Sequence, residues 1–116
     1  MYKSVKIGDK SVPMMAMASI NLYYKRIFRR DPIKVQADEG TTPGDKINLY
    51  LEMGFVMAQF AETKGNRKKM NQLNEDSYMD WLEQFELSDY MGAVNDIIEV
   101  YEGQKGVSSQ EKKEES

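Results

Sequence analysis

The sequence predicts an α+β protein that is mostly α-helical, with an N-terminal β-hairpin, about four helices and a disordered C-terminal tail. Three observations lead to this fold class. Apolar and polar side chains alternate on either side of Gly8-Asp9-Lys10, as in a hairpin. From residue 18 to residue 101, apolar residues recur at steps of three and four, as in helices. Beyond residue 102 only Val107 is large and apolar, so this segment cannot bury enough surface to fold.

The hairpin is predicted at the start of the chain. Its first strand covers Tyr2 to Ile7, its turn is Gly8-Asp9-Lys10, and its second strand covers Ser11 to Met15. Pro13 has no amide hydrogen to donate to a ladder, so the second strand is expected to lie at an edge or to stop pairing there.

A first helix is predicted from Ala18 or Ser19 to about Arg30, with Ser19 as a candidate N-cap. Its inward-facing residues are expected to be Ile20, Tyr23, Tyr24, Ile27 and Phe28. Pro32 should end the helix, because the residue before a proline is disfavoured in the helical region. The stretch from Gln36 to Gly44 has no apolar period and is predicted to be a mobile surface loop.

A long second helix is predicted from Asp45, its expected N-cap, to about Thr63. Its apolar residues are Ile47, Tyr50, Leu51, Gly54, Phe55, Met57, Ala58 and Ala61. They surround most of the helix, which is therefore expected to lie in the middle of the domain. Gly65-Asn66 should end it, and Arg67-Lys68-Lys69 should form a basic connector.

Residues 74 to 102 contain nine acidic side chains and no Lys or Arg, and they are predicted to form two short acidic helices. Asn74 or Asp76 should cap the first of these, which turns Tyr78, Trp81, Leu82 and Phe85 toward the core. Ser88-Asp89 should start the second. Its apolar stripe is Leu87, Tyr90, Met91, Val94, Ile97, Ile98 and Tyr101. The predicted domain therefore ends at residue 102, and residues 103–116 form the predicted tail.

The composition of the 116 residues bounds the possible functions. The chain has no Cys and no His, which excludes disulfides and removes the usual nucleophiles, the usual proton shuttle and the commonest transition-metal ligands. It also lacks a Gly-rich phosphate-binding loop. We therefore expect a protein that is not an enzyme and needs no cofactor or metal.

Neither a secretory signal nor a membrane span is expected. The N-terminus has no long apolar stretch followed by a cleavage site. The longest apolar region, Leu49 to Ala61, is interrupted by Glu52 and Gln59 and is shorter than the roughly 18 residues that a membrane span needs. The absence of Cys fits a reducing cytoplasm.

Charge is distributed unevenly along the chain. Residues 1–36 carry eight Lys or Arg and two Asp, whereas residues 74–102 carry only acids. Such a dipole favours head-to-tail self-association or a charged protein partner, although each charge is equally consistent with an ordinary solvated face. Lys25, Arg26, Arg29 and Arg30 form a basic cluster that phosphates would suit, but a net charge of -3 argues against nucleic-acid binding.

Candidate partner-binding residues are aromatic or Met side chains. They are Met14, Met15, Met17, Tyr23, Tyr24, Trp81 and Tyr90. The three Met residues fit two interpretations equally, an adaptable binding surface or a filling of core gaps. Trp81 fits an interface anchor or core packing. Asp76, Asp80 and Glu83 share a helical face where a divalent ion is conceivable, but a solvated face explains them better.

The order of elements resembles a known family. The hairpin, the helix YYKRIFRRD, the long helix LYLEMGFVMA, and the acidic pair with WLEQF and IIEVY together resemble the tail assembly chaperones of long-tailed bacteriophages of Gram-positive hosts. The resemblance covers roughly residues 2 to 102. Family members often have a Gly at the end of the first helix, where this chain has Arg29-Arg30.

The resemblance implies a function without catalysis. Such chaperones bind the tape measure protein, keep it soluble, help recruit tail tube protein in the host cytoplasm, and are absent from the finished virion. The family also commonly makes a longer product by ribosomal frameshifting, for which Glu111-Lys112-Lys113-Glu114 suits an A-rich slippery stretch. The alternative is a small acidic helical adaptor or regulator of a host or phage enzyme, with residues 74–102 as the presented surface.

Overall fold

The computed structural model describes residues 2–37, 40 and 42–113, with side chains described as far as residue 103. Its elements are β1 (Tyr2–Ile7), β2 (Lys10–Met15), α1 (Ile20–Phe28), α2 (Pro32–Ala37), α3 (Pro43–Thr63), α4 (Arg67–Met70), α5 (Glu75–Leu82), α6 (Leu87–Gly92) and α7 (Val94–Lys113). The α+β class and the hairpin are confirmed, whereas the prediction of about four helices was too low. The predicted tail of residues 103–116 falls within α7 as far as Lys113, and residues 114–116 lie outside the described ones.

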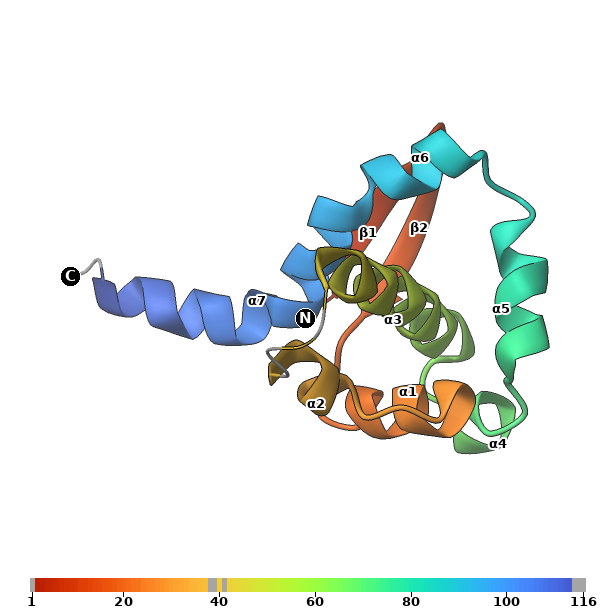
Figure 1. Ribbon diagram of the computed structural model, residues 1–116, viewed down its shortest axis with the longest axis horizontal. Helices are drawn as coiled ribbons and strands as arrows, with labels where there is room; N and C mark the ends of the chain where they lie inside the picture. The colour runs from red at the N-terminus through yellow and green to blue at the C-terminus, as the bar shows by residue number, and fades with distance from the viewer. Residues whose placement is uncertain (1, 38–39, 41, 114–116) are drawn as a thin grey trace.

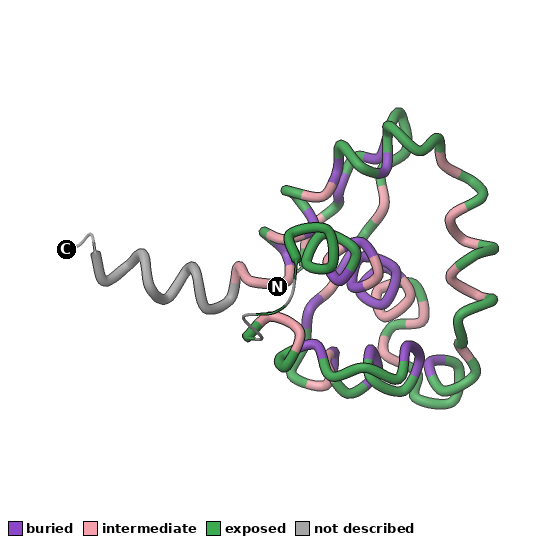
Figure 2. Tube along the Cα trace, in the orientation of Figure 1, coloured by how far each residue is buried: buried purple, intermediate pink, exposed green. Residues whose placement is uncertain are grey.

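Helix α3 lies in the middle of the molecule, as predicted (Figures 1 and 2). The hairpin and α7 pack on one side of it, α1 and α2 lie below it, and α5 stands at the far edge. Its buried residues are Leu49, Leu51, Met53, Gly54, Phe55, Val56, Met57 and Ala58. Because this segment is apolar around most of its circumference, it forms the core on which the other elements pack.

The hairpin turn consists of Gly8 and Asp9 and is one residue shorter than predicted, because Lys10 pairs with Ile7 and begins β2. Ile7 pairs with Lys10, and Gly8 takes the positive φ of 65° that such turns require at their first central position. Pro13 pairs with Ser4 in a sheet of two strands, so it lies at an edge as predicted. On its other side β1 lies beside α7, where Lys3 and Glu99 form an ion pair.

Helix α1 buries the five residues predicted to face inward, but it ends earlier than predicted. Arg29 adopts the left-handed conformation, with φ of 62°, and this reversal ends the helix at Phe28. Pro32 therefore does not end α1. It begins α2, where the Asp31 carboxylate accepts a hydrogen bond of 3.0 Å from the backbone N–H of Ile33.

The start of α3 also differs from the prediction. Thr42 is the N-cap and Asp45 is the third helical residue, and the two form a reciprocal capping box. The predicted loop from Gln36 to Gly44 is shorter, because α2 and α3 extend into it; residues 38, 39 and 41 are outside the described ones. Arg67-Lys68-Lys69 forms most of the short helix α4 and is not an extended connector.

The acidic segment forms three helices where two were predicted. Asn74, one of the two candidate caps, accepts a hydrogen bond from the Ser77 N–H at the start of α5. No residue of α5 is fully buried. The predicted fourth helix is broken at Ala93 into α6 and α7, and α6 begins at Leu87, ahead of Ser88-Asp89.

Candidate partner-binding groove

An open groove of about 830 Å³ runs between β2 and α5, with α3 as its floor. We call it the β2–α5 groove. It is lined by Lys10, Ser11, Val12 and Pro13 of β2, by Phe55, Gln59 and Glu62 of α3, and by Ser77, Asp80, Trp81, Gln84 and Phe85 of α5 and the residues after it. The groove is possible because α5 makes few contacts with the rest of the domain and contributes no fully buried residue.

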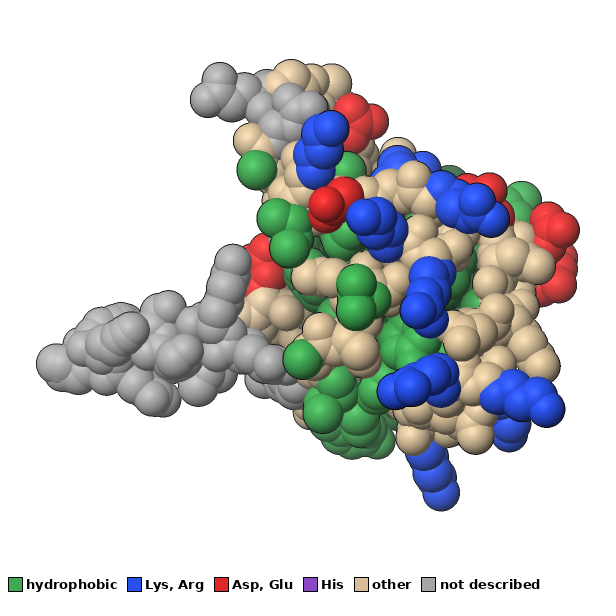
Figure 3. Space-filling model, turned by 90° about the horizontal axis from the view of Figure 1, so that it is seen from below, with side chains coloured by type: hydrophobic (Ala, Val, Ile, Leu, Met, Phe, Trp, Pro, Cys, Tyr) green, Lys and Arg blue, Asp and Glu red, His purple; other side chains and the backbone are tan. Residues whose placement is uncertain are grey.

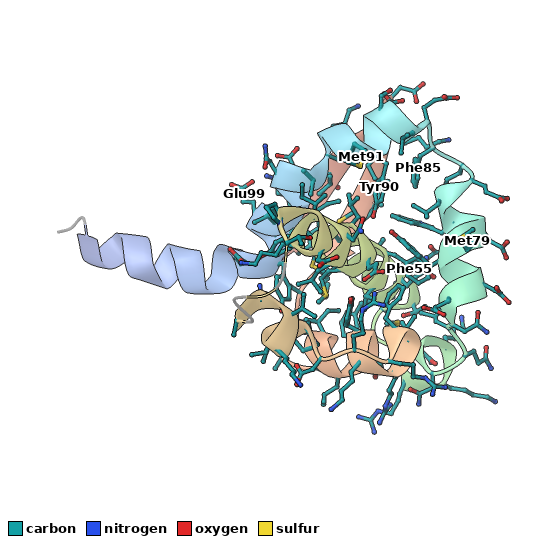
Figure 4. All side chains as sticks on the ribbon, viewed as in Figure 1. Phe55, Met79, Phe85, Tyr90, Met91 and Glu99 are labelled. Carbon is teal, nitrogen blue, oxygen red and sulfur yellow. The ribbon has the colours of Figure 1, made fainter. Side chains whose placement is uncertain are left out.

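An aromatic cluster holds α5 in place. The Trp81 ring lies 5.4 Å from that of Phe55, 5.0 Å from Phe85 and 5.5 Å from Tyr90. Phe85 and Tyr90 stack with nearly parallel rings 5.7 Å apart. Figure 4 shows Phe55, Phe85 and Tyr90 directed into the space between α3, α5 and α6. Trp81 and Phe85 are half-buried, so they leave apolar ring surface open in the groove, whereas Phe55 and Tyr90 are buried beneath them.

The other wall of the groove is an open strand edge. In an antiparallel hairpin with a two-residue turn, the residues beside the turn exchange hydrogen bonds, and every second residue from there points its backbone groups outward. Ile7 and Lys10 are the pair beside the turn, so the N–H and C=O of Ser11 and the C=O of Pro13 point away from β1. Figure 1 shows that this side of β2 faces α5.

The rim of the groove is mostly acidic. Glu62 and Asp80 lie in its walls, and α5 also carries Glu75 and Asp76 with no basic residue. Lys10 is the basic residue among the lining side chains and sits at one end of β2. A positively charged partner segment is therefore favoured over an acidic one.

A second apolar surface lies on the opposite side of the molecule, at α1 and α2. Met17 is 49% exposed and Ile33 is 59% exposed, and both line a hollow of about 390 Å³ with Tyr101. Figure 3 looks at this side and shows many Lys and Arg side chains between apolar ones. Met17 and Ile33 therefore leave apolar side-chain surface open at this hollow.

Polar side chains of α1, of the residues after it and of α3 form hydrogen bonds with one another. Glu52 accepts hydrogen bonds from the Tyr24 hydroxyl at 2.5 Å and from the Arg30 guanidinium at 2.5 and 2.6 Å. Burial and the Glu52 carboxylate raise the pKa of Tyr24, and the same carboxylate raises the pKa of Arg30. Tyr24 is thereby held neutral and Arg30 charged, and both side chains line a hollow of about 400 Å³ together with Glu52.

The structure separates the candidate partner-binding residues into core and surface. Met14, Tyr23, Tyr24 and Tyr90 are buried, so in this conformation a partner would not reach them. Met15 is half-buried, and Met17 is exposed on the α1 side. Trp81 is half-buried in the β2–α5 groove and packs against Tyr90. The seven residues therefore do not form one site.

The groove residues on β2 were not among the candidate partner-binding residues. Ser11, Val12 and Pro13 are separated from Trp81 and Phe85 by about 70 residues, and nothing in either segment indicates the other. Pro13 was the one available signal, because an edge proline identifies a strand side that is not paired within the sheet.

The acidic cluster on α5 and the basic cluster at the end of α1 do not form binding sites. Among the residues that the structure describes, no group of three acids that could hold a metal ion occurs, and this includes Asp76, Asp80 and Glu83. In the basic cluster, Arg30 bonds to Glu52 and Arg26 bonds to the Asn71 side chain at 2.7 Å. Two of its four side chains are therefore used within the domain.

Comparison of the chain with protein-family models, curated proteins and solved structures found no match. The helices in the described part of the chain include none with the length and apolar character that crossing a membrane requires.

Proposed function

We propose that this protein is a tail assembly chaperone of a long-tailed bacteriophage. It binds the tape measure protein in the host cytoplasm, keeps it soluble and promotes assembly of tail tube protein around it. The observation that carries this proposal is the β2–α5 groove, an open aromatic surface with an acidic rim. Such a groove offers contact area to a protein segment and no reacting group to a small substrate.

Two further features support binding as the function. The apolar side chains of Met17 and Ile33 provide a second contact surface on the opposite side, so one copy can contact two segments or two partners. The resemblance of residues 2–102 to tail assembly chaperones implies the tape measure protein as the partner, whose apolar surface has to be covered. A tape measure protein presents long apolar helical surfaces before the tail tube encloses them.

Co-expression with the tape measure protein of the same phage tests the proposal. The wild-type chain should keep the tape measure protein in the soluble fraction and co-purify with it. Gln59→Arg and Gln84→Arg place a long cation among the groove-lining residues and should reduce co-purification at least tenfold, because they block the groove without touching the core.

Met79→Arg is the matched control, since Met79 is 56% exposed on α5 and does not line the groove. It should leave co-purification unchanged. A tape measure protein that aggregates equally with and without the wild-type chain would reject the proposal.

The gene offers an independent test. A chaperone of this family should have a slippery heptanucleotide before the stop codon and an overlapping reading frame beyond it, which would produce the longer form.

Many copies would cover one tape measure protein, so weak head-to-tail self-association is also expected from the opposed basic and acidic faces. Sedimentation at high protein concentration and low salt should show it, and a strictly monomeric profile would exclude it.

The second candidate is an acidic adaptor that binds a host or phage enzyme. The acidic outer face of α5, with Glu75, Asp76 and Glu83 all exposed, favours this alternative. Purification of the chain from infected cells separates the two functions. A tape measure protein as the bound species supports the chaperone, and a polymerase, nuclease or repressor supports the adaptor.

A further inference from the structure

We infer that the β2–α5 groove binds its partner segment as an extended strand that pairs with Ser11 at the open edge of β2. The inference rests on the proposed function of the groove as the partner site, and it specifies the conformation and side-chain pattern of the bound segment. A helix lying in the groove is the alternative that the experiment below must exclude.

The backbone of β2 supplies the first argument. Ser11 presents both an N–H and a C=O toward the groove, and Pro13 presents a C=O. Within the described part of the chain, no residue outside the hairpin hydrogen-bonds to these groups. A bound helix satisfies its own backbone groups internally and would leave those of β2 unpaired, whereas an added strand pairs with them.

The dimensions of the groove supply the second argument. Its wall on β2 extends from Lys10 to Pro13, about 10 Å at 3.3 Å per residue. An extended chain covers that length with three or four residues at about 3.3 Å each. A helix with its side chains is about 10 Å wide and would place only two turns there, beside a wall formed by the single strand β2.

The lining residues specify the side chains of the bound segment. A strand beside β2 turns alternate residues toward the floor, where the half-buried Trp81 and Phe85 offer an apolar surface over the buried ring of Phe55. The residues between them face solvent. Basic residues at the ends of the segment would lie close to Glu62 or Asp80. The preferred segment therefore has Lys or Arg at both ends, with β-branched apolar residues and polar residues alternating between them.

Pro13 limits the strength of this pairing. A full edge strand would offer another donor at this position, but Pro13 has none, so a bound strand gains only the two bonds of Ser11 and one bond to the Pro13 carbonyl. The missing donor also discourages two copies from pairing through β2. The resulting contact is short and reversible. A chaperone that must later release its bound protein requires such a contact.

The single Trp of the chain gives a direct readout, because Trp81 lies in the groove. The probe is a synthetic peptide, acetyl-Lys-Thr-Val-Thr-Val-Thr-Lys-amide, titrated into the full-length protein. Its binding should shift the Trp81 emission and slow hydrogen exchange of the Ser11 amide at least tenfold. The same peptide with N-methylated Thr residues cannot form the strand bonds and should bind at least tenfold more weakly.

Two variants complete the test. Pro13→Val restores the missing donor and should tighten binding of the unmodified peptide several-fold. Ser4→Val is the matched control, because Ser4 pairs with Pro13 but its backbone groups point to the opposite edge of the hairpin.

The inference is overturned if the peptide leaves the Trp81 emission unchanged, or if N-methylation and Pro13→Val have no effect on binding. It is also overturned if an amphipathic helical peptide of the same charge binds more tightly without protecting the Ser11 amide. Either outcome leaves the proposed function standing as long as the tape measure protein still co-purifies, because that experiment does not depend on the conformation of the bound segment.

Discussion

Replacing Gly54 with Ala should destabilise the domain, although alanine favours helix formation. Gly54 lies in α3 where α7 packs most closely against it. A Cβ at this position would lie 2.9 Å from Ile97 Cδ1 and 3.0 Å from the Tyr90 hydroxyl oxygen. Ile97 is fully buried, and the Tyr90 hydroxyl donates a hydrogen bond to the Leu51 carbonyl, so neither neighbour can move away freely.

Two opposing terms set the magnitude. Adding a methyl group to a packed core costs about 1–3 kcal/mol, and replacing Gly by Ala inside a helix contributes about 1 kcal/mol of stability. The expected net loss is therefore about 1 kcal/mol, or roughly 4–8 °C in Tm for a domain of this size. Urea unfolding followed by circular dichroism measures it, with an unchanged m-value if the unfolded state is unaffected.

Gly92→Ala is the matched control. Gly92 is the last residue of α6, and a Cβ there would meet no atom within 4 Å. Only the helix-propensity term remains, so this variant should be more stable by up to about 1 kcal/mol. Adding Ile97→Val to Gly54→Ala removes the clashing Cδ1 atom and should cost less than the two separate losses combined. A Gly54→Ala protein as stable as Gly92→Ala would refute the packing argument.

Three other changes follow from local structure. Asn74→Ala removes the cap of α5 and should cost about 1 kcal/mol in urea unfolding, with a smaller effect if α5 is already frayed. Arg29→Gly relieves the left-handed conformation at the end of α1 and should raise stability by about 0.5–1 kcal/mol; a loss would show that the Arg29 side chain matters more than its backbone. Burial raises the pKa of Tyr78 and Tyr90, and burial together with the Glu102 hydrogen bond raises the pKa of Tyr50 to about 12. The unfolded chain therefore releases these protons first, near pH 10, so the stability they contribute is complete below about pH 10 and is lost as pH rises toward 12 and beyond. Thermal unfolding between pH 8 and pH 12 should show a falling Tm, and a flat profile would contradict the burial of these hydroxyls.

The sequence was sufficient for elements whose signals are local. The inward residues of α1 follow from a strict helical period, and the hairpin follows from alternation on either side of Gly8, although its turn is one residue shorter than predicted. Even the missed helix α2 had a local signal, because Asp31-Pro32 is a cap followed by a proline at the first helical position. That pattern was interpreted as the end of α1, since a proline after a helix and a proline opening the next one look alike in sequence.

The arrangement of the acidic helices was not predictable in the same way. The apolar stripe from Leu87 to Tyr101 keeps a helical period across Ala93, where the chain breaks, because α6 and α7 both turn apolar residues toward α3. Leu87 and Met91 lie on that stripe yet are exposed. The β2–α5 groove depends on contacts between segments about 70 residues apart, which periodicity does not record.

The pairing of the first strand with the last helix has a consequence for synthesis. Val5 and Ile7 have few buried partners near them in the sequence, and Glu99 is 96 residues beyond the lysine that it contacts. While the ribosome is still producing the middle of the chain, β1 therefore lacks α6 and α7, the helices that pack against it. The domain can complete its folding only when residue 100 has left the ribosome exit tunnel, so folding should be late and cooperative. A stalled or truncated product should be cleaved readily by proteases.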